Sequence, residues 1–145
     1  MRDLKIVLLT ADPERLRGAL AMAAAHAALG GAAQMFFQMD AVVLLSHDAS
    51  APRDAAHASA GMPRLAALIE EALGLGVALV ACQSGLALAE IDAATLDPRI
   101  ATGGRSASCK ASAIPTGCFS CNLDTRAKAT IAIRKTGSRA GISGP

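Results

Sequence analysis

The stretch VALVACQSG, residues 77–85, decides the fold. Its first five residues are apolar and partly β-branched, which is typical of a strand buried inside a parallel sheet. The polar turn at residues 83–85 then leads into a helix that we expect over about residues 86–91. Cys82 therefore lies where a strand ends and a helix begins.

The same alternation of strand and helix extends to both sides of this stretch. Further strands are expected at residues 4–10 and 33–37 and in a run ending at residues 102–104. Helices are expected at residues 13–29 and from Pro63 to about residue 73. Asp12-Pro13 is a helix start signal and Gly30-Gly31 a stop signal. Residues 40–45 fit either a strand or a short helix, and residues 46–61 are predicted to be a loop. The pattern predicts parallel βαβ units, with helices on both faces of one sheet.

Cys82 is the leading candidate for a reactive residue, because functional residues in such sheets lie outside the carboxyl ends of the strands. Backbone N–H groups and the dipole at a helix start stabilise a thiolate and lower a thiol pKa. Ser84 and Gly85 would help to shape the pocket around it. The alternative is a small cysteine that only packs in the core. Both interpretations stay open on the residues alone.

Composition and missing motifs exclude several classes of function. No apolar run approaches the ~20 residues of a membrane helix, and the N-terminus lacks the features of a signal peptide. We therefore expect a cytoplasmic protein whose four cysteines are reduced thiols and not a disulfide framework. Neither a phosphate-binding glycine motif nor a Gly-x-Ser-x-Gly elbow is present, so nucleotide binding and hydrolysis are not expected.

The order of these features resembles the DsrE/DsrF-like family over about residues 4–104. The resemblance rests on a small-residue first helix, the Phe36-Phe37 strand leading into DAVVLL, and a strand, GVALVAC, that ends in Cys82. It implies a flavodoxin-like, three-layer α/β/α sheet, assembly into a homo-oligomer, and sulfur held as a persulfide on Cys82. Sulfur-donor and acceptor proteins are the implied partners, with no metal or organic cofactor, and any activity would be of the sulfurtransferase type. Ala89-Glu90 stands near the place of an arginine-glycine pair found in many members, which argues against a strongly basic site.

Residues 105–145 depart from the family, which would continue with an apolar helix and a last strand. They are rich in Ser, Cys, Lys, Arg and Gly, with no helix or strand period. Residues 1–104 hold 7 Lys or Arg and 11 Asp or Glu, for a net charge of −4, whereas residues 105–145 hold 7 Lys or Arg and 1 Asp, for a net charge of +6. One explanation is a disordered basic tail.

A shifted reading frame is the other explanation for residues 105–145. Cys and Phe codons, and the Ser codons that begin with TC, encode apolar residues when they are read one base early. For residues 105–121, codon choices exist that read in that frame as an apolar helix, an acidic turn and a final strand. The chain would then be a domain over residues 1–104 followed by a sequence foreign to the family.

Three weaker candidates remain. The Cys118-Phe119-Ser120-Cys121 motif could be a redox pair or half a zinc site, but no histidine follows residue 57 and coincidence is the preferred interpretation. His47 and His57 could act as acid or base, although exposed loop histidines are the simpler expectation. The basic tail lacks interleaved aromatics, so nucleic-acid binding is not expected. Two hypotheses follow: a sulfur relay through Cys82, or a non-catalytic oligomeric binding module in which Cys82 only packs.

Overall fold

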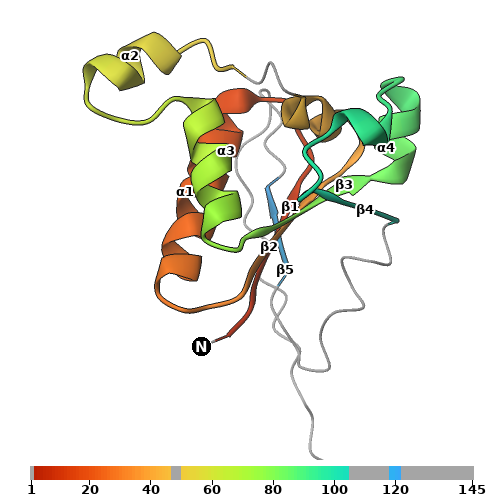
Figure 1. Ribbon diagram of the computed structural model, residues 1–145, viewed down its shortest axis with the longest axis horizontal. Helices are drawn as coiled ribbons and strands as arrows, with labels where there is room; N and C mark the ends of the chain where they lie inside the picture. Colours follow the sequence, from red (N-terminus) through yellow and green to blue (C-terminus); the bar gives the residue numbers. More distant parts are fainter. Residues whose placement is uncertain (1, 47–49, 105–117, 122–145) are drawn as a thin grey trace, which may run out of the picture.

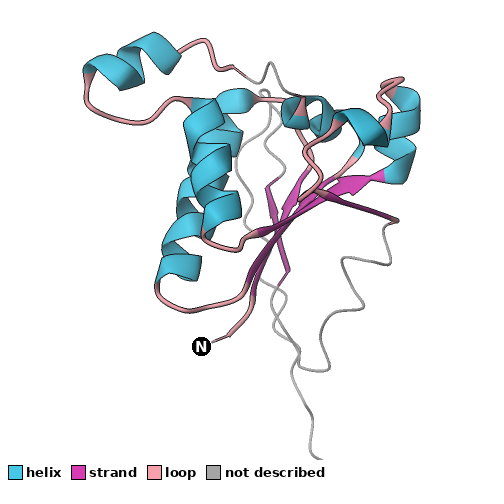
Figure 2. Cartoon of the chain, viewed as in Figure 1, coloured by secondary structure: helices cyan, strands magenta, loops and turns pink. Residues whose placement is uncertain are grey.

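The computed structural model describes residues 2–46, 50–104 and 118–121 of the chain (Figure 1). Strands alternate with helices through most of these residues (Figure 2). In chain order the elements are β1 (Leu4–Leu8), α1 (Pro13–Ala28), β2 (Ala33–Phe37), η1 (Met39–Leu45), α2 (Asp54–Ser59), α3 (Leu65–Gly74), β3 (Ala78–Cys82), α4 (Gln83–Leu88), η2 (Ala93–Thr95), β4 (Ala101–Gly103) and β5 (Cys118–Cys121).

The strands form one parallel sheet in the order β4-β3-β2-β1-β5. Each of the first three strands is followed by helical structure before the next strand begins. The predicted flavodoxin-like α/β fold is therefore confirmed. No helix in the described part of the chain has the length and apolar character needed to cross a membrane.

Helix α1 begins as the sequence predicts. The Asp12 carboxylate accepts the backbone N–H groups of Glu14 at 2.9 Å and Arg15 at 3.3 Å, and Pro13 occupies the first helical position. The helix stops before Gly30, whose φ of +83° suits a residue without a side chain.

The core lies between the sheet and helices α1 and α3, which pack side by side (Figure 1). Alternate residues of the three inner strands share one face of the sheet and are almost fully buried: Ile6, Leu8, Met35, Phe37, Leu79 and Ala81. From the helices, Leu16, Leu20 and Leu65 are each 0% exposed. This packing fixes the register of the strands, because a shift by one residue would turn the apolar row away from the helices.

Three details of the sequence expectations need correction. Residues 46–61 are not all loop, because they contain α2, and α3 begins at Leu65 instead of Pro63. The helix after Cys82 begins at Gln83 instead of about Leu86. Residues 40–45, left open before, belong to the 3₁₀ helix η1.

Four residues of the tail lie among the described residues. Residues Cys118–Cys121 form β5, which pairs with β1 from Lys5↔Cys118 to Leu8↔Cys121. The absence of a strand pattern in residues 105–145 was therefore misleading for these four residues. The other expectations for residues 105–145, disordered tail or shifted frame, fall on 105–117 and 122–145, outside the described residues.

Candidate functional site

Cys82 lies at the carboxyl end of β3, as the sequence predicts. It is the last residue of that strand and the N-cap residue of α4, with extended backbone angles of φ −69° and ψ 120°. Strand β3 is an inner strand, paired with β2 on one side and β4 on the other. A side chain at this place is fixed by two neighbouring strands and by the start of a helix.

Cys82 is buried, with 2% of the residue's surface exposed. It carries a thiol and is not half of a disulfide. Cys82 therefore occupies the position expected of a reactive cysteine, but it is not directly accessible to solvent.

The β-ladder places a glycine beside Cys82. In the register between β3 and β4, Cys82 is the direct partner of Gly103, which is also buried. Paired residues of adjacent strands present their side chains on the same face. Because Gly103 has no side chain, β4 places no Cβ atom beside the Cys82 side chain at this pair.

Helix α4 packs closely against η1. A Cβ added at Gly85 would lie 2.5 Å from the carbonyl oxygen of Met39 and 3.0 Å from Val42 Cγ1. Met39 itself has φ +52°, a left-handed conformation that costs a non-glycine residue free energy. Gly85 therefore serves a close backbone approach, and Ser84, which is exposed, does not enclose the cysteine.

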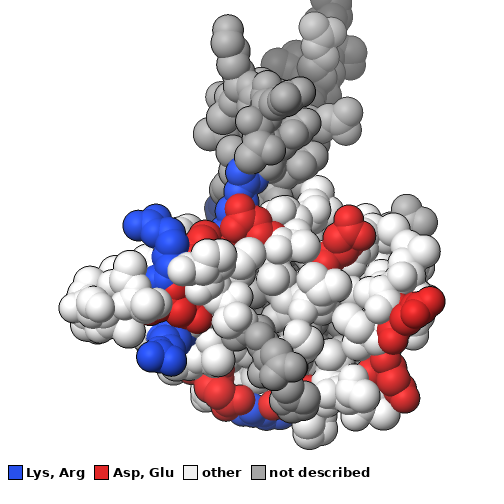
Figure 3. Space-filling view, turned by 90° about the horizontal axis from the view of Figure 1, so that it is seen from above, with Lys and Arg blue, Asp and Glu red and all other residues white. Residues whose placement is uncertain are grey.

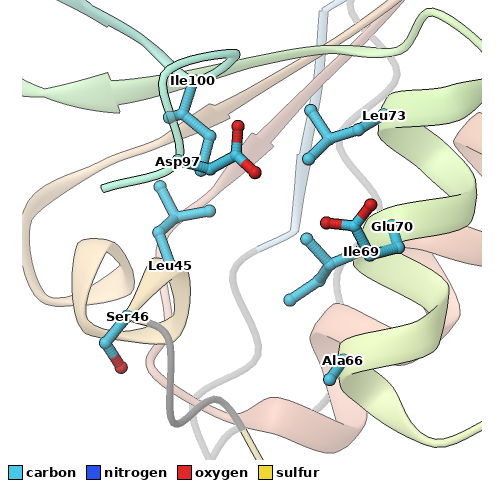
Figure 4. A pocket seen from close by; sticks show the side chains of 8 residues that line it. All are labelled: Leu45, Ser46, Ala66, Ile69, Glu70, Leu73, Asp97 and Ile100. Atoms are coloured by element: carbon cyan, nitrogen blue, oxygen red, sulfur yellow. The ribbon is translucent and has the colours of Figure 1, made fainter. Parts of the chain in front are cut away.

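A pocket of about 120 Å³ lies elsewhere, between α3, the end of η1 and residues 97–100 (Figure 4). Its walls are mostly apolar, and the carboxylates of Glu70 and Asp97 face it (Figure 4). Arg99 Nη2 lies 2.6 Å from a carboxylate oxygen of each, and these hydrogen bonds raise the pKa of the arginine above its ordinary value. Cys82 does not line this pocket, so the two features are separate.

Besides this pocket, the sequence did not predict a charged cluster between α1 and α2. His57 was expected to be a solvated loop histidine, but it belongs to α2 and its side chain is only 15% exposed. Its Nε2 atom lies 3.3 Å from Glu14 Oε2. The acidic first turn of α1 was the only signal in the sequence, and nothing in it named His57 as the partner. His47 lies outside the described residues.

The described residues contain no group of three His, Cys, Asp or Glu side chains that could hold a metal ion. The Cys118–Cys121 motif is a strand, β5. A thioredoxin-type motif instead joins a strand to a helix. The backbone at Cys118–Cys121 therefore differs from the one that such a redox pair uses.

The fold and the site together define a class: a parallel α/β protein with a buried, free cysteine at the end of an inner strand. No protein-family model matches the chain, and no curated protein matches it.

Proposed function

We propose that the chain is a sulfur carrier of the DsrE/DsrF-like type, which holds sulfane sulfur as a persulfide on Cys82 and passes it to a partner thiol. The position of Cys82, at the carboxyl end of an inner strand and at the start of α4, carries the proposal. Its setting is the cytoplasm, where thiols are kept reduced. Donor and acceptor proteins, and further copies of the chain, are the proposed partners.

The transfer needs no external oxidant. The Cys82 thiolate attacks the outer sulfur of a donor persulfide, the donor S–S bond breaks, and the donor leaves as a thiolate while a new S–S bond forms on Cys82. An acceptor thiolate then attacks the outer sulfur of the Cys82 persulfide, takes it, and releases the Cys82 thiolate. Both steps follow the rules of thiol–disulfide exchange, so they depend on the thiolate fraction and on access to the sulfur.

Access is the demanding step, because Cys82 is 2% exposed. The proposal requires the residues that cover Cys82 to move aside before the exchange and to return afterwards. Helix α4 has six residues, and it approaches η1 closely at Gly85. A buried persulfide would be shielded from competing thiols between the two transfers. Gly103, the β4 partner of Cys82, presents no side chain to it.

The same burial favours a second candidate function. In an oligomeric binding module of this fold, Cys82 would be a small core residue with no chemistry. Such a thiol reacts only when the protein unfolds. The 2% exposure of Cys82 is the observation that supports this alternative.

Loading with inorganic polysulfide separates the two functions. The full-length protein is treated under native conditions, thiols and persulfides are alkylated, and the tryptic peptide of residues 65–99 is weighed. Since trypsin cuts after Arg64 and Arg99, Cys82 is the only cysteine of that peptide. A mass increase of one sulfur atom on this peptide, transferred onward to a low-molecular-weight thiol, is the expected result.

The matched control replaces Cys109, Cys118 and Cys121 with serine and leaves Cys82 in place. It should load as the parent does, whereas Cys82→Ser should not load on this peptide. If Cys82 stays unmodified in the folded protein and reacts only in denaturant, the sulfur-carrier proposal is wrong and the binding-module function stands.

A further inference from the structure

A segment at the edge of the domain is attached to the rest of the fold almost entirely by charged groups. We propose that residues 52–64, called the strap, open and close as a unit while the remainder of the domain stays folded. The strap is held shut by four side chains, called the latch: Glu14 and Arg17 from α1, and Asp54 and His57 from the strap itself. This inference does not depend on Cys82.

The strap contributes nothing to the hydrophobic core. Its helix, α2, has no buried residue, and it projects beyond α1 and α3 (Figure 1). Asp54 and His57 are the only residues of the strap that are not exposed, and both belong to the latch. Hydrophobic burial therefore does not hold the strap in place, and the polar contacts must.

Arg17 fastens both ends of the strap with one guanidinium group. It pairs with the Asp54 carboxylate at the start of α2, and its Nη1 atom donates to the carbonyl oxygen of Pro63 at 2.6 Å, near the other end. The Arg17 side chain is 11% exposed and that of Asp54 is 17% exposed. At this degree of burial an ion pair is screened less than one at the open surface.

Glu14 adds two contacts from one turn earlier on α1. Its Oε1 atom accepts the backbone N–H of Arg53 at 2.9 Å, and its Oε2 atom lies 3.3 Å from His57 Nε2. Glu14 Oε2 also lies 3.4 Å from Arg17 Nε. Acidic and basic side chains gather accordingly beside the projecting lobe in the view from above (Figure 3). Because all these contacts meet on a single turn of α1, loss of one weakens the others, and the strap is released as a unit.

The two ends of the strap are anchored in the core. Ala51, just before it, is 7% exposed, and Leu65, just after it, is 0% exposed. The Asp54 carboxylate accepts the backbone N–H groups of both, Ala51 at 3.1 Å and Leu65 at 2.9 Å. A segment with fixed ends and a middle without core contacts is expected to open locally at a low free-energy cost. Opening would bring Arg17, Glu14 and the Leu65 N–H into contact with solvent.

Trypsin tests the strap directly, because Arg53 and Arg64 both lie in it. The full chain is digested briefly under native conditions, and the rates of cleavage after Arg53, Arg64 and Arg99 are followed by mass spectrometry. Arg99 lies in the body of the domain, paired with Glu70 and Asp97, and reports opening outside the strap. In the parent chain we expect cleavage after Arg53 and Arg64 to precede cleavage after Arg99.

Arg17→Met should raise the rates at Arg53 and Arg64 by roughly tenfold, because proteolysis follows the population of the open form. The rate at Arg99 should stay unchanged. Arg15→Met is the matched control: Arg15 lies on the same turn of α1 but pairs locally with Asp12 at 3.2 Å, so its loss should leave the strap rates as they are.

Two outcomes would overturn the proposal: an Arg17→Met variant whose cleavage after Arg99 rises in step with the strap sites, or one whose strap rates do not change. If Arg17→Met does not fold, hydrogen exchange on the parent chain decides. Strap amides that exchange at a rate independent of low denaturant, while the α1 amides stay protected, support a local opening. Exchange of both segments with one common denaturant dependence contradicts it.

Discussion

The Asp54 carboxylate accepts the backbone N–H of Leu65 at 2.9 Å, so a side chain of α2 caps a helix that begins 11 residues later. The residue at the N-cap position of α3, Arg64, makes no side-chain cap hydrogen bond. Helix α3 thus takes its cap from outside itself, from the residue that also pairs with Arg17.

Asp54→Ala should therefore destabilise the whole domain as well as the strap, because the start of α3 loses its acceptor. We expect a clear fall in the urea midpoint. Asp54→Asn should fall between Asp54→Ala and the parent chain, since an amide oxygen still accepts from Leu65 but no longer carries charge toward Arg17. Asp92→Ala is the control, because Asp92 caps only the exposed η2. Equal midpoints for Asp54→Ala and Asp92→Ala would contradict the long-range cap.

Gly85→Ala tests the contact between α4 and η1. Its Cβ would lie 2.5 Å from a backbone oxygen, that of Met39, which cannot turn away as a side chain can. We expect a loss of about 1–3 kcal/mol in the free energy of unfolding, as for other overpacked sites. Cys82 should also be alkylated faster in this variant, because α4 is displaced.

Gly18→Ala provides the comparison for Gly85→Ala. Gly18 lies inside α1, and a Cβ there would meet nothing within 4 Å. The change should stabilise the chain by about 0.5–1 kcal/mol through helix propensity. A neutral Gly85→Ala beside a stabilising Gly18→Ala would show that α4 and η1 have room to separate at no cost.

Acid should weaken the domain through the latch. Partial desolvation raises the pKa of Glu14, but the hydrogen bonds from Arg53 and His57 and the charge of Arg17 outweigh it, so the pKa lies below its ordinary value. Desolvation likewise raises the pKa of Asp54. The hydrogen bonds from the N–H groups of Ala51 and Leu65, together with Arg17, outweigh it, so the pKa of Asp54 also lies below its ordinary value. Both carboxylates then stabilise the folded state above the pKa of the unfolded chain, and this contribution is lost as the pH falls through the lowered folded values.

The urea midpoint should accordingly hold between about pH 7 and pH 5 and fall below about pH 4.5, where the carboxyl groups of the unfolded chain begin to bind protons. Glu14→Gln should start from a lower midpoint and decline less steeply. Parallel pH curves for the parent and Glu14→Gln would mean that other carboxyl groups cause the acid sensitivity.

A chain that ends at Gly104 should be less stable than the full chain. It lacks β5, so the backbone of β1 from Lys5 to Leu8 loses its second partner and becomes an open edge. We expect a lower urea midpoint and faster aggregation on warming. Identical midpoints would show that the pairing of β5 with β1 adds nothing. The reading-frame hypothesis is tested separately by the coding DNA after Gly104, which must permit the alternative apolar reading.

The inner sheet could be predicted from sequence because its signals are local. The apolar run at residues 33–37 is β2 as predicted, and Asp12-Pro13 and Gly30 bound α1 with little else needed. The place of Cys82 followed from the same runs. The burial of Cys82 could not be predicted in the same way, because burial depends on neighbours from other parts of the sequence, including β4.

The parts that could not be predicted are those held by distant polar partners. Helix α2 has no buried residue, and its contacts come from Glu14 and Arg17, residues 37 to 43 positions away. Strand β5 likewise has no alternating pattern and is defined by pairing with β1. Neither leaves a periodic signal in its own sequence.

The strand order has a consequence for synthesis. Strand β1 leaves the ribosome first, yet it lies inside the sheet, between β2 and β5. Strands β1 to β4 are available for pairing once residue 103 has emerged, but the outer edge of β1 must wait for Cys118–Cys121. Joining two segments that are far apart in the sequence is slow, because the intervening loop must close first. The sheet is thus expected to be completed late, and until then one edge of β1 has no strand partner.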